Sequence, residues 1–312
     1  MTKSSSSSKR GGLKRMMNTL IRREDLRSRT RVACAVLAML GLGGCSWVAL
    51  AAKETALSAT GRYGLDSFTL EGTLPVEFGM DIKPWYGPVD PQSSACQRQD
   101  MDGESSPRYH GTSDNIPIQA KPQTFSHQVP LTYSVGLCRM RLTALDLWIN
   151  GRYGQQRWQQ TYANGGFRIF NALPAGAPGF GDDGVRAVTA QCNWLFQQSQ
   201  ARSRLGEISK LLTCAAAGTH LQYDQLAGKT VKLAIEVNPD ERPYYKDTWI
   251  KFPNGWKPCK TEDNDWIWCR TPPTFQTFQM NGQTCTIYPG CTEQAVGAPP
   301  PYSRIPISPD AR

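Results

Sequence analysis

The sequence predicts a mainly β protein with minor helix, in which antiparallel sheets form a sandwich or barrel tied by disulfide bonds. Three observations favour this fold class. Several segments alternate apolar and polar residues with period two, which is typical of strands with one buried and one solvated face. Eight cysteines lie in the body of the chain, beyond an apolar leader. Proline, glycine and Asn-Gly signals separate the alternating segments.

Residues 1–44 have the layout of a signal peptide. Residues 1–31 contain ten basic and two acidic side chains, a net charge of +8, and an apolar run of 13 residues follows at 32–44. A bilayer core requires about 20 apolar residues, so this run alone is too short to span it. Because the whole chain carries +9, the remainder is nearly neutral, and no nucleic-acid partner is expected.

The apolar run ends in the sequence LGGC at residues 42–45, which resembles the lipobox of bacterial lipoproteins. The resemblance implies cleavage before Cys45, acylation there by chains such as palmitate and, from Ser46, sorting to the outer membrane with the body facing the periplasm. Two alternatives remain open: cleavage after Ala51 by an ordinary signal peptidase, or an uncleaved span that extends to Ala52. All three place the body outside the cytoplasm.

An even number of body cysteines outside the cytoplasm indicates disulfide bonds. Pairing in sequence order gives Cys96–Cys138, Cys192–Cys214, Cys259–Cys269 and Cys285–Cys291. Zinc bound by the last four cysteines is the alternative. Their gaps of nine, fifteen and five residues exceed the two to four that usually separate paired zinc ligands, so we expect no metal site and no cofactor.

The mature chain is expected to contain four regions. They are a lipidated tether at 45–65, a β-rich N-terminal region at 66–180, a β-rich region with many Cys and Trp at 181–293, and a disordered Pro-rich tail at 294–312. The boundary between the two β-rich regions lies in the Pro/Gly-rich segment 173–184.

The alternation at residues 68–82 predicts one long strand, placed at a sheet edge or bulged at Pro75 because proline cannot donate to a ladder. Residues 84–130 are polar and predict a long surface excursion held by Cys96. Residues 138–150 alternate with a change of phase near Ala144-Leu145, which indicates a bulge. The following Asn150-Gly151 pair predicts a turn.

Three further segments predict strands, at residues 165–170, 188–197 and 230–237. Between them, the spacing of apolar side chains predicts one face of a short helix, formed by Leu205, Ile208, Leu211 and Leu212. Near the end, Asn281-Gly282 between two strands predicts a hairpin with a type I′ turn.

No catalytic constellation is evident in the sequence, and we assign no catalytic residue. The three histidines, His110, His127 and His220, lie in no metalloprotease or hydrolase motif. Aromatic residues become dense after residue 240, and Trp and Tyr are enriched at binding hot spots. Trp256, which follows a Pro-Asn-Gly turn, together with Trp266 and Trp268, is the candidate partner-binding set. A disulfide-tied β core would use the same residue types.

Four stretches carry a resemblance to a protein family: FPNGWKPC at 252–259, the Cys-rich segment 266–291, and residues 138–162 and 195–214. They resemble a group of Gram-negative envelope lipoproteins that are similar to the immunity proteins of type VI secretion phospholipase effectors. The resemblance implies a periplasm-facing protein that binds and blocks a phospholipase toxin and is not an enzyme. A structural or assembly lipoprotein of the envelope and a hydrolase with an unrecognised site remain the alternatives.

Overall fold

The structure is a computed structural model that describes residue 48 and residues 51–99, 103–260 and 269–293. The chain forms two compact units. The first contains residues 1–62, 90–108 and 134–139, and the second contains residues 63–89, 109–133 and 140–312. The expected signal peptide, Cys45 and the expected tail at 294–312 lie outside the described residues. Within the described ranges, no helix has the length and apolarity needed to cross a bilayer.

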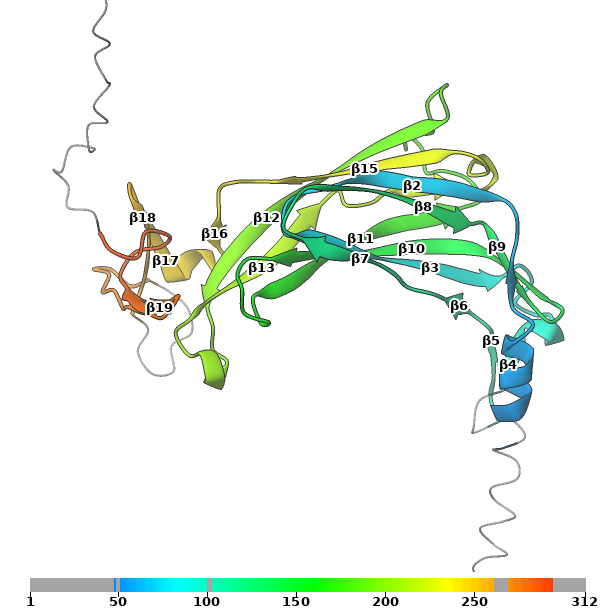
Figure 1. The fold of residues 1–312 in the computed structure, drawn as a ribbon, viewed down its shortest axis with the longest axis horizontal. Helices are drawn as coiled ribbons and strands as arrows, with labels where there is room; N and C mark the ends of the chain where they lie inside the picture. Colours follow the sequence, from blue (N-terminus) through cyan, green and yellow to red (C-terminus); the bar gives the residue numbers. More distant parts are fainter. Residues whose placement is uncertain (1–47, 49–50, 100–102, 261–268, 294–312) are drawn as a thin grey trace, which may run out of the picture. The chain divides into compact units, whose positions relative to one another are not determined.

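The expected fold class is confirmed: the protein is mainly β, with antiparallel sheets and one half-barrel (Figure 1). The eight-stranded sheet contains β1 (Arg62–Tyr63), β3 (Phe78–Pro88), β6 (His110–Gly111), β7 (Asp114–Gln119), β9 (Thr132–Val135), β10 (Cys138–Arg152), β11 (Gln160–Phe170) and β14 (His220–Gln222). The six-stranded sheet has the order β13 (Ile208–Ala215), β12 (Val185–Gln198), β15 (Thr230–Val237), β2 (Ser67–Leu74), β8 (Gln123–Pro130), with β16 (Arg242–Pro243) beside β12.

Besides these two sheets, the described residues form three two-stranded ladders and four single 3₁₀ turns. The ladders pair β4 (Gln97–Gln99) with β5 (Ser105–Pro107), β17 (Trp249–Phe252) with β18 (Gly255–Pro258), and β19 (Phe278–Met280) with β20 (Gln283–Cys285). The 3₁₀ turns are η1 (Ser94–Cys96), η2 (Arg202–Arg204), η3 (Tyr223–Gln225) and η4 (Lys246–Thr248). The six-stranded sheet is mixed, because β15 pairs parallel with both β12 and β2.

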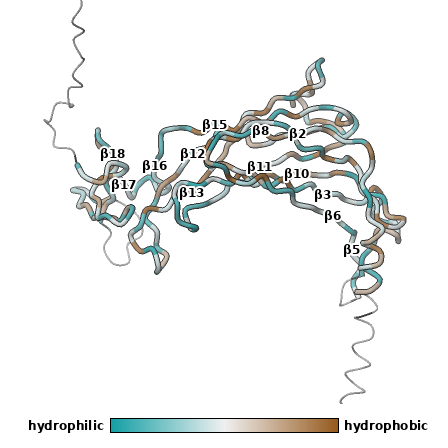
Figure 2. Tube along the Cα trace, viewed as in Figure 1, coloured by the Kyte–Doolittle hydropathy of each residue, from teal (hydrophilic) through white to brown (hydrophobic). Residues whose placement is uncertain are grey.

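The inner faces of the two large sheets pack against each other. Apolar and polar residues intersperse along the strands of both sheets (Figure 2), which matches one buried and one solvated face. Trp194 of β12 lies against Gly151 of β10, where an added Cβ would come within 2.7 Å of the indole. A side chain at position 151 would collide with the opposite sheet, so only glycine fits there. The rings of Phe78 and Trp194 also meet edge to face.

The single strand expected at residues 68–82 is wrong, because the segment forms two strands in different sheets. β2 ends at Leu74 and β3 begins at Phe78, so Pro75 lies in the intervening turn. Glu77 has a positive φ of 65° there, and Val76 is exposed. The alternation survives the turn because Leu74 and Phe78 are both buried, which is why the sequence pattern hides the break.

The bulge expected near Ala144-Leu145 is confirmed, since the register of β10 against β3 shifts between Leu142 and Ala144. The turn expected at Asn150-Gly151 is wrong. Both residues continue β10, where Asn150 pairs with Gly79 of β3 and with Tyr162 of β11. Two neighbouring strands therefore hold this Asn-Gly pair in an extended conformation.

Two expectations about segments without regular structure are also wrong. Residues 84–130 are not one surface excursion, because they supply β7 and β8 to the two large sheets. The segment 173–184 does not separate two β regions. Strands from both sides of it, β2 and β15, pair directly in the six-stranded sheet, so the two sides share one fold.

The helix expected from Leu205 to Leu212 is wrong: residues 208–215 form β13. This strand pairs antiparallel with β12 along its length, and Cys192 lies opposite Cys214. Tertiary pairing and the disulfide bond Cys192–Cys214 override the weak helical spacing. The other three disulfide bonds are Cys96–Cys138, Cys259–Cys269 and Cys285–Cys291, so all four pairs follow sequence order.

The hairpin expected at Asn281-Gly282 is confirmed. β19 and β20 pair antiparallel, and both turn residues have positive φ, 52° and 77°, as a type I′ turn requires. The hairpin packs on a small second core formed by Phe196, Ile208, Trp249, Phe278, Cys285 and Tyr288. The Tyr288 hydroxyl donates to Glu241, whose other oxygen lies 2.6 Å from Lys210 Nζ on β13.

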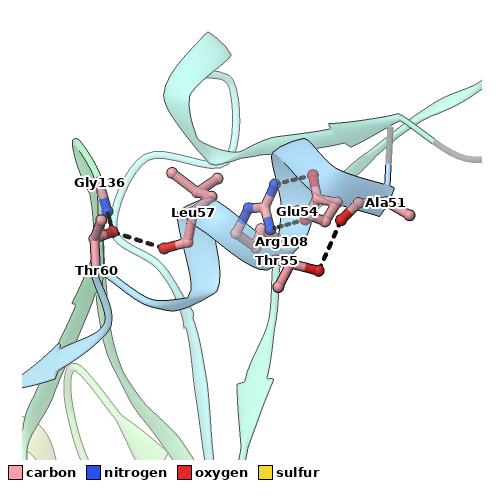
Figure 3. A network of polar contacts seen from close by, with 7 residues as sticks. All are labelled: Ala51, Glu54, Thr55, Leu57, Thr60, Arg108 and Gly136. Carbon is pink, nitrogen blue, oxygen red and sulfur yellow. Dashed lines mark hydrogen bonds and ion pairs between the residues drawn. The ribbon is translucent and has the colours of Figure 1, made fainter. Parts of the chain in front are cut away.

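In the first unit, residues 51–58 are helical, so the expected tether at 45–65 is not wholly a loose linker. Figure 3 shows this helix docked on the rest of the unit. Arg108 donates two hydrogen bonds to the Glu54 carboxylate, at 2.6 and 2.9 Å. The hydrogen bonds from Arg108 hold the pKa of Glu54 below its ordinary value. The helix is thereby held to the segment that carries Cys96.

The end of this helix contacts the loop at Gly136. The Thr60 hydroxyl accepts a hydrogen bond from the Gly136 amide at 2.8 Å and donates one to the Leu57 carbonyl at 2.6 Å (Figure 3). Gly136 has φ +56°, and a Cβ there would lie 2.7 Å from the Leu57 side chain. Only glycine satisfies both constraints. Residues 51–60 are therefore a docked part of the first unit.

We expect Glu54→Gln to loosen this helix by about 1–2 kcal/mol, because the variant removes the charge that both Arg108 hydrogen bonds use. The free energy of local opening, measured by hydrogen exchange of residues 51–58, checks this. Glu71→Gln is the matched control: Glu71 forms an exposed ion pair with Lys232 at 3.5 Å, and its loss should cost less than about 0.5 kcal/mol. Equal effects of the two variants would contradict the docking role of Glu54.

Candidate functional site

The outer face of the eight-stranded sheet carries a cluster of exposed aromatic and charged side chains. Alternation along β3 and β10 directs every second side chain to this face. We call the cluster the platform; it consists of Asp81, Lys83, Trp85, Asn115, Asp146, Trp148, Asn150, Tyr162 and Arg168. The three large rings remain exposed: Trp85 by 42%, Trp148 by 37% and Tyr162 by 50%.

One end of the platform is organised around Asp146. Its two carboxylate oxygens accept hydrogen bonds from Trp85 Nε1 at 2.8 Å and from Arg168 Nη1 at 2.7 Å. The indole of Trp85 also lies over Gly111 of β6, where a Cβ would come within 2.7 Å of the ring. The ring and the guanidinium are thus held in fixed positions by a shared acceptor and by the bare backbone of the neighbouring strand.

The middle of the platform is a stack of three side chains. Lys83 Nζ lies 3.0 Å from the centroid of the Trp148 ring. The Trp148 and Tyr162 rings are nearly parallel, with centroids 5.1 Å apart and planes at 13°. A cation over an exposed ring contributes about 0.5–1 kcal/mol, and exposed ion pairs contribute little. These contacts therefore orient the side chains more than they stabilise the fold.

A hollow of about 440 Å³ adjoins the platform at the Tyr162 end. The described residues that line it are Asn115, Ile116, Pro117, Ile118, Asn150, Gln160, Thr161 and Tyr162. None carries a formal charge. The hollow lies within the 300–1,000 Å³ range of small-ligand sites. The platform and the hollow together offer chemistry suited to binding: flat rings, the Asp146–Arg168 ion pair at one end, and at the other a lining of uncharged groups beside Asp81.

The partner-binding residues expected from the sequence are not the ones that form the platform. Trp256 is half-buried and packs against the second core. Its ring contacts Phe196 at 6.1 Å, and its backbone pairs with Tyr288. Trp256 is therefore not a freely exposed ring, because the C-terminal core uses it for packing; its role in partner binding stays a prediction. Trp266 and Trp268 lie outside the described residues.

A hydrolase would require a histidine in its site, but neither His110 nor His127 lies in the hollow. His127 Nε2 lies 3.5 Å from Asp114, but neither residue lines the hollow. His110 stacks on Tyr133, with centroids 3.7 Å apart, and its Nε2 lies 3.0 Å from the Tyr63 hydroxyl. Burial among aromatic rings lowers the pKa of His110. In the described part of the chain, no group of three potential metal ligands occurs.

Sequence reasoning missed Trp85, Trp148 and Tyr162, although a signal for two of them exists. In β3 the odd-numbered Asp81 and Lys83 mark the solvated face, and Trp85 continues that series. In β10, after the bulge, Trp148 falls in phase with polar Asp146. When an aromatic residue occupies the same alternating positions as the polar residues of a strand, its ring is expected on the solvated face.

No protein-family model, no curated protein and no solved structure matches this chain.

The stability of the fold is expected to fall as the pH drops below about 6.5, because the unfolded chain then binds the proton that folded His110 resists. Above that pH this group contributes no pH dependence. Unfolding curves measured between pH 8 and pH 5 check the sign. The His110→Gln variant should show a smaller slope. Tyr63→Phe should keep the slope, since the cause is burial and not the hydroxyl. A slope unchanged in His110→Gln would contradict this account.

Proposed function

We propose that this protein is a lipid-anchored immunity protein that faces the periplasm, where it binds and neutralises a phospholipase toxin delivered by type VI secretion. The observation that supports a binding role is the platform, in which exposed rings and an arginine are held in place on paired strands. Trp, Tyr and Arg are the residue types enriched at binding hot spots. The resemblance to envelope lipoproteins supports the identity of the partner.

The rigidity of the platform favours tight binding. Trp85 and Arg168 share the Asp146 carboxylate, so neither has to be ordered when a partner docks. Ordering a free side chain on association costs about 0.5–1.5 kcal/mol. An inhibitor must bind tightly, because one uninhibited enzyme molecule cleaves many lipids. An interface of about 1,600 Å² reaches nanomolar affinity when a few such residues anchor it.

The docked helix supports anchoring close to the membrane. If Cys45 is acylated, only residues 46–50 separate it from the helix at 51–58. Six backbone steps span at most about 20 Å. The start of the helix would then lie within that distance of the acylated residue, and so near the membrane where a lipid-degrading enzyme acts. Fatty-acid labelling that is lost in Cys45→Ala tests the anchor separately from toxin binding.

The immunity function is tested by expressing in the periplasm any phospholipase that is found encoded beside this protein, with and without the protein. We expect protection and co-purification. Trp85→Ala and Arg168→Ala should each weaken the complex by about 2 kcal/mol, or about 30-fold in Kd. Tyr244→Ala, which removes an exposed ring outside the platform, is the matched control and should change the Kd less than about twofold.

One result would contradict the proposed function, and another would contradict the platform as its interface. Failure to bind and to protect against any neighbouring phospholipase would exclude the immunity function, and a structural or assembly lipoprotein of the envelope would take its place. Protection that survives both platform variants would retain the function but move the interface elsewhere. Trp256→Ala is unsuitable as a test, because its packing against the second core means that it would change folding as well as binding.

A further inference from the structure

We infer that the hollow beside Tyr162 is a binding site for a neutral glycan, with an N-acetylated hexosamine ring as its occupant. This inference does not rest on the immunity function, although the site shares Asp81, Asn115, Asn150 and Tyr162 with the platform. It rests on the lining of the hollow, which combines one exposed aromatic ring, several uncharged amide and hydroxyl groups and a short apolar wall. These are the groups that complement the apolar face, the hydroxyl edge and the acetamido methyl of such a sugar.

The aromatic part of the site is Tyr162. Its ring is half exposed and lines the hollow. The ring also stacks on Trp148, which Lys83 covers in turn. This stack holds the ring in place. A supported, flat ring beside a hollow offers the surface on which the C–H groups of a pyranose ring pack.

The polar part of the site is oriented by Asp81, which acts as a positioning residue. Its two carboxylate oxygens accept one hydrogen bond each, from Asn115 Nδ2 at 2.6 Å and from Asn150 Nδ2 at 3.1 Å. Each asparagine retains an amide oxygen and a second N–H, for which the described residues supply no further side-chain partner. Both asparagines line the hollow, so paired acceptors and donors are available to sugar hydroxyls and to an acetamido group.

The third part of the site is the wall formed by Ile116, Pro117 and Ile118 of β7. This strand lies close to Gly79, where an added Cβ would come within 2.6 Å of the Ile116 carbonyl oxygen and 2.8 Å of the Ile118 amide. Glycine at this position therefore lets the backbone of residues 116–118 approach β3 beside the hollow. The wall favours a ligand that carries a methyl group in addition to hydroxyls.

Charge selects the class of ligand. No described lining residue is charged, and the adjacent Asp81 carboxylate is occupied by the two asparagines. An anionic ligand would find no cation in the lining and would meet the negative charge of the adjacent Asp81 carboxylate, whose oxygens each already accept one asparagine N–H. An acidic peptide and a phosphorylated headgroup are thereby disfavoured, and an uncharged, polyhydroxylated ring fits the lining.

Calorimetric titration of the folded protein with chitotetraose tests the inference, with maltotetraose as the matched sugar that lacks acetamido groups. We expect chitotetraose to bind with a Kd of about 1 mM or lower and maltotetraose to bind at least about tenfold more weakly. Tyr162→Ala should weaken chitotetraose binding at least about tenfold, whereas Tyr162→Phe should stay within about twofold, because the ring supplies the contact. Asn150→Leu should also lose at least about tenfold.

Controls separate this site from the proposed immunity function. Trp85→Ala should leave chitotetraose binding unchanged and weaken only the toxin complex, and thermal unfolding of each variant verifies that it folds. No binding at about 10 mM chitotetraose would overturn the inference, as would binding that survives Tyr162→Ala. Equal affinity for both sugars would overturn the N-acetylated class. Each of these results leaves the outcome of the toxin experiment unaffected.

Discussion

The bulge in β10 is the constraint on which both the core and the platform depend. Before the bulge, Met140 and Leu142 are buried, and after it Leu145, Leu147 and Ile149 are buried. The parity of the buried positions therefore changes at Thr143. Without the extra residue, continued alternation from Leu142 would turn Asp146 and Trp148 inward and three aliphatic side chains outward, since a slip of one residue exchanges the two faces of a strand. One inserted residue thus fixes which side chains meet solvent.

Much of the fold is predictable because its local signals agree with its tertiary contacts. The strand at 230–237, the hairpin at Asn281-Gly282 and the bulge in β10 are all visible as period-two patterns or turn residues. The order of the disulfide bonds follows proximity along the chain, because two of the pairs close short loops of 6 and 10 residues. These features depend on a few neighbouring residues, so a single sequence suffices to find them.

The failed expectations share one cause, which is pairing between residues far apart in sequence. Asn150-Gly151 has the composition of a turn, yet β3 and β11 pair with it on both sides. The apolar spacing at 205–212 suits a short helix, yet the Cys192–Cys214 bond and the β12 ladder impose a strand. β2 and β3 join different sheets although one uninterrupted alternation runs through both. The partners that decide these conformations are absent from each local window.

The candidate site illustrates the same limit at the level of function. The sequence directs attention to the dense aromatic residues after position 240, but aromatic density there reflects a small core that Trp249, Phe278 and Tyr288 fill. The platform instead collects isolated rings from three strands, and only the register brings Trp85, Trp148 and Tyr162 to one face. Three sets of contacts hold the platform in place. Asp146 binds Trp85 and Arg168 at one end, Trp148 stacks on Tyr162 in the middle, and Asp81 binds the two asparagines at the other end. Because every support projects from a paired strand, the surface is preorganised, and a partner or ligand that binds there avoids most of the ordering cost of flexible loops.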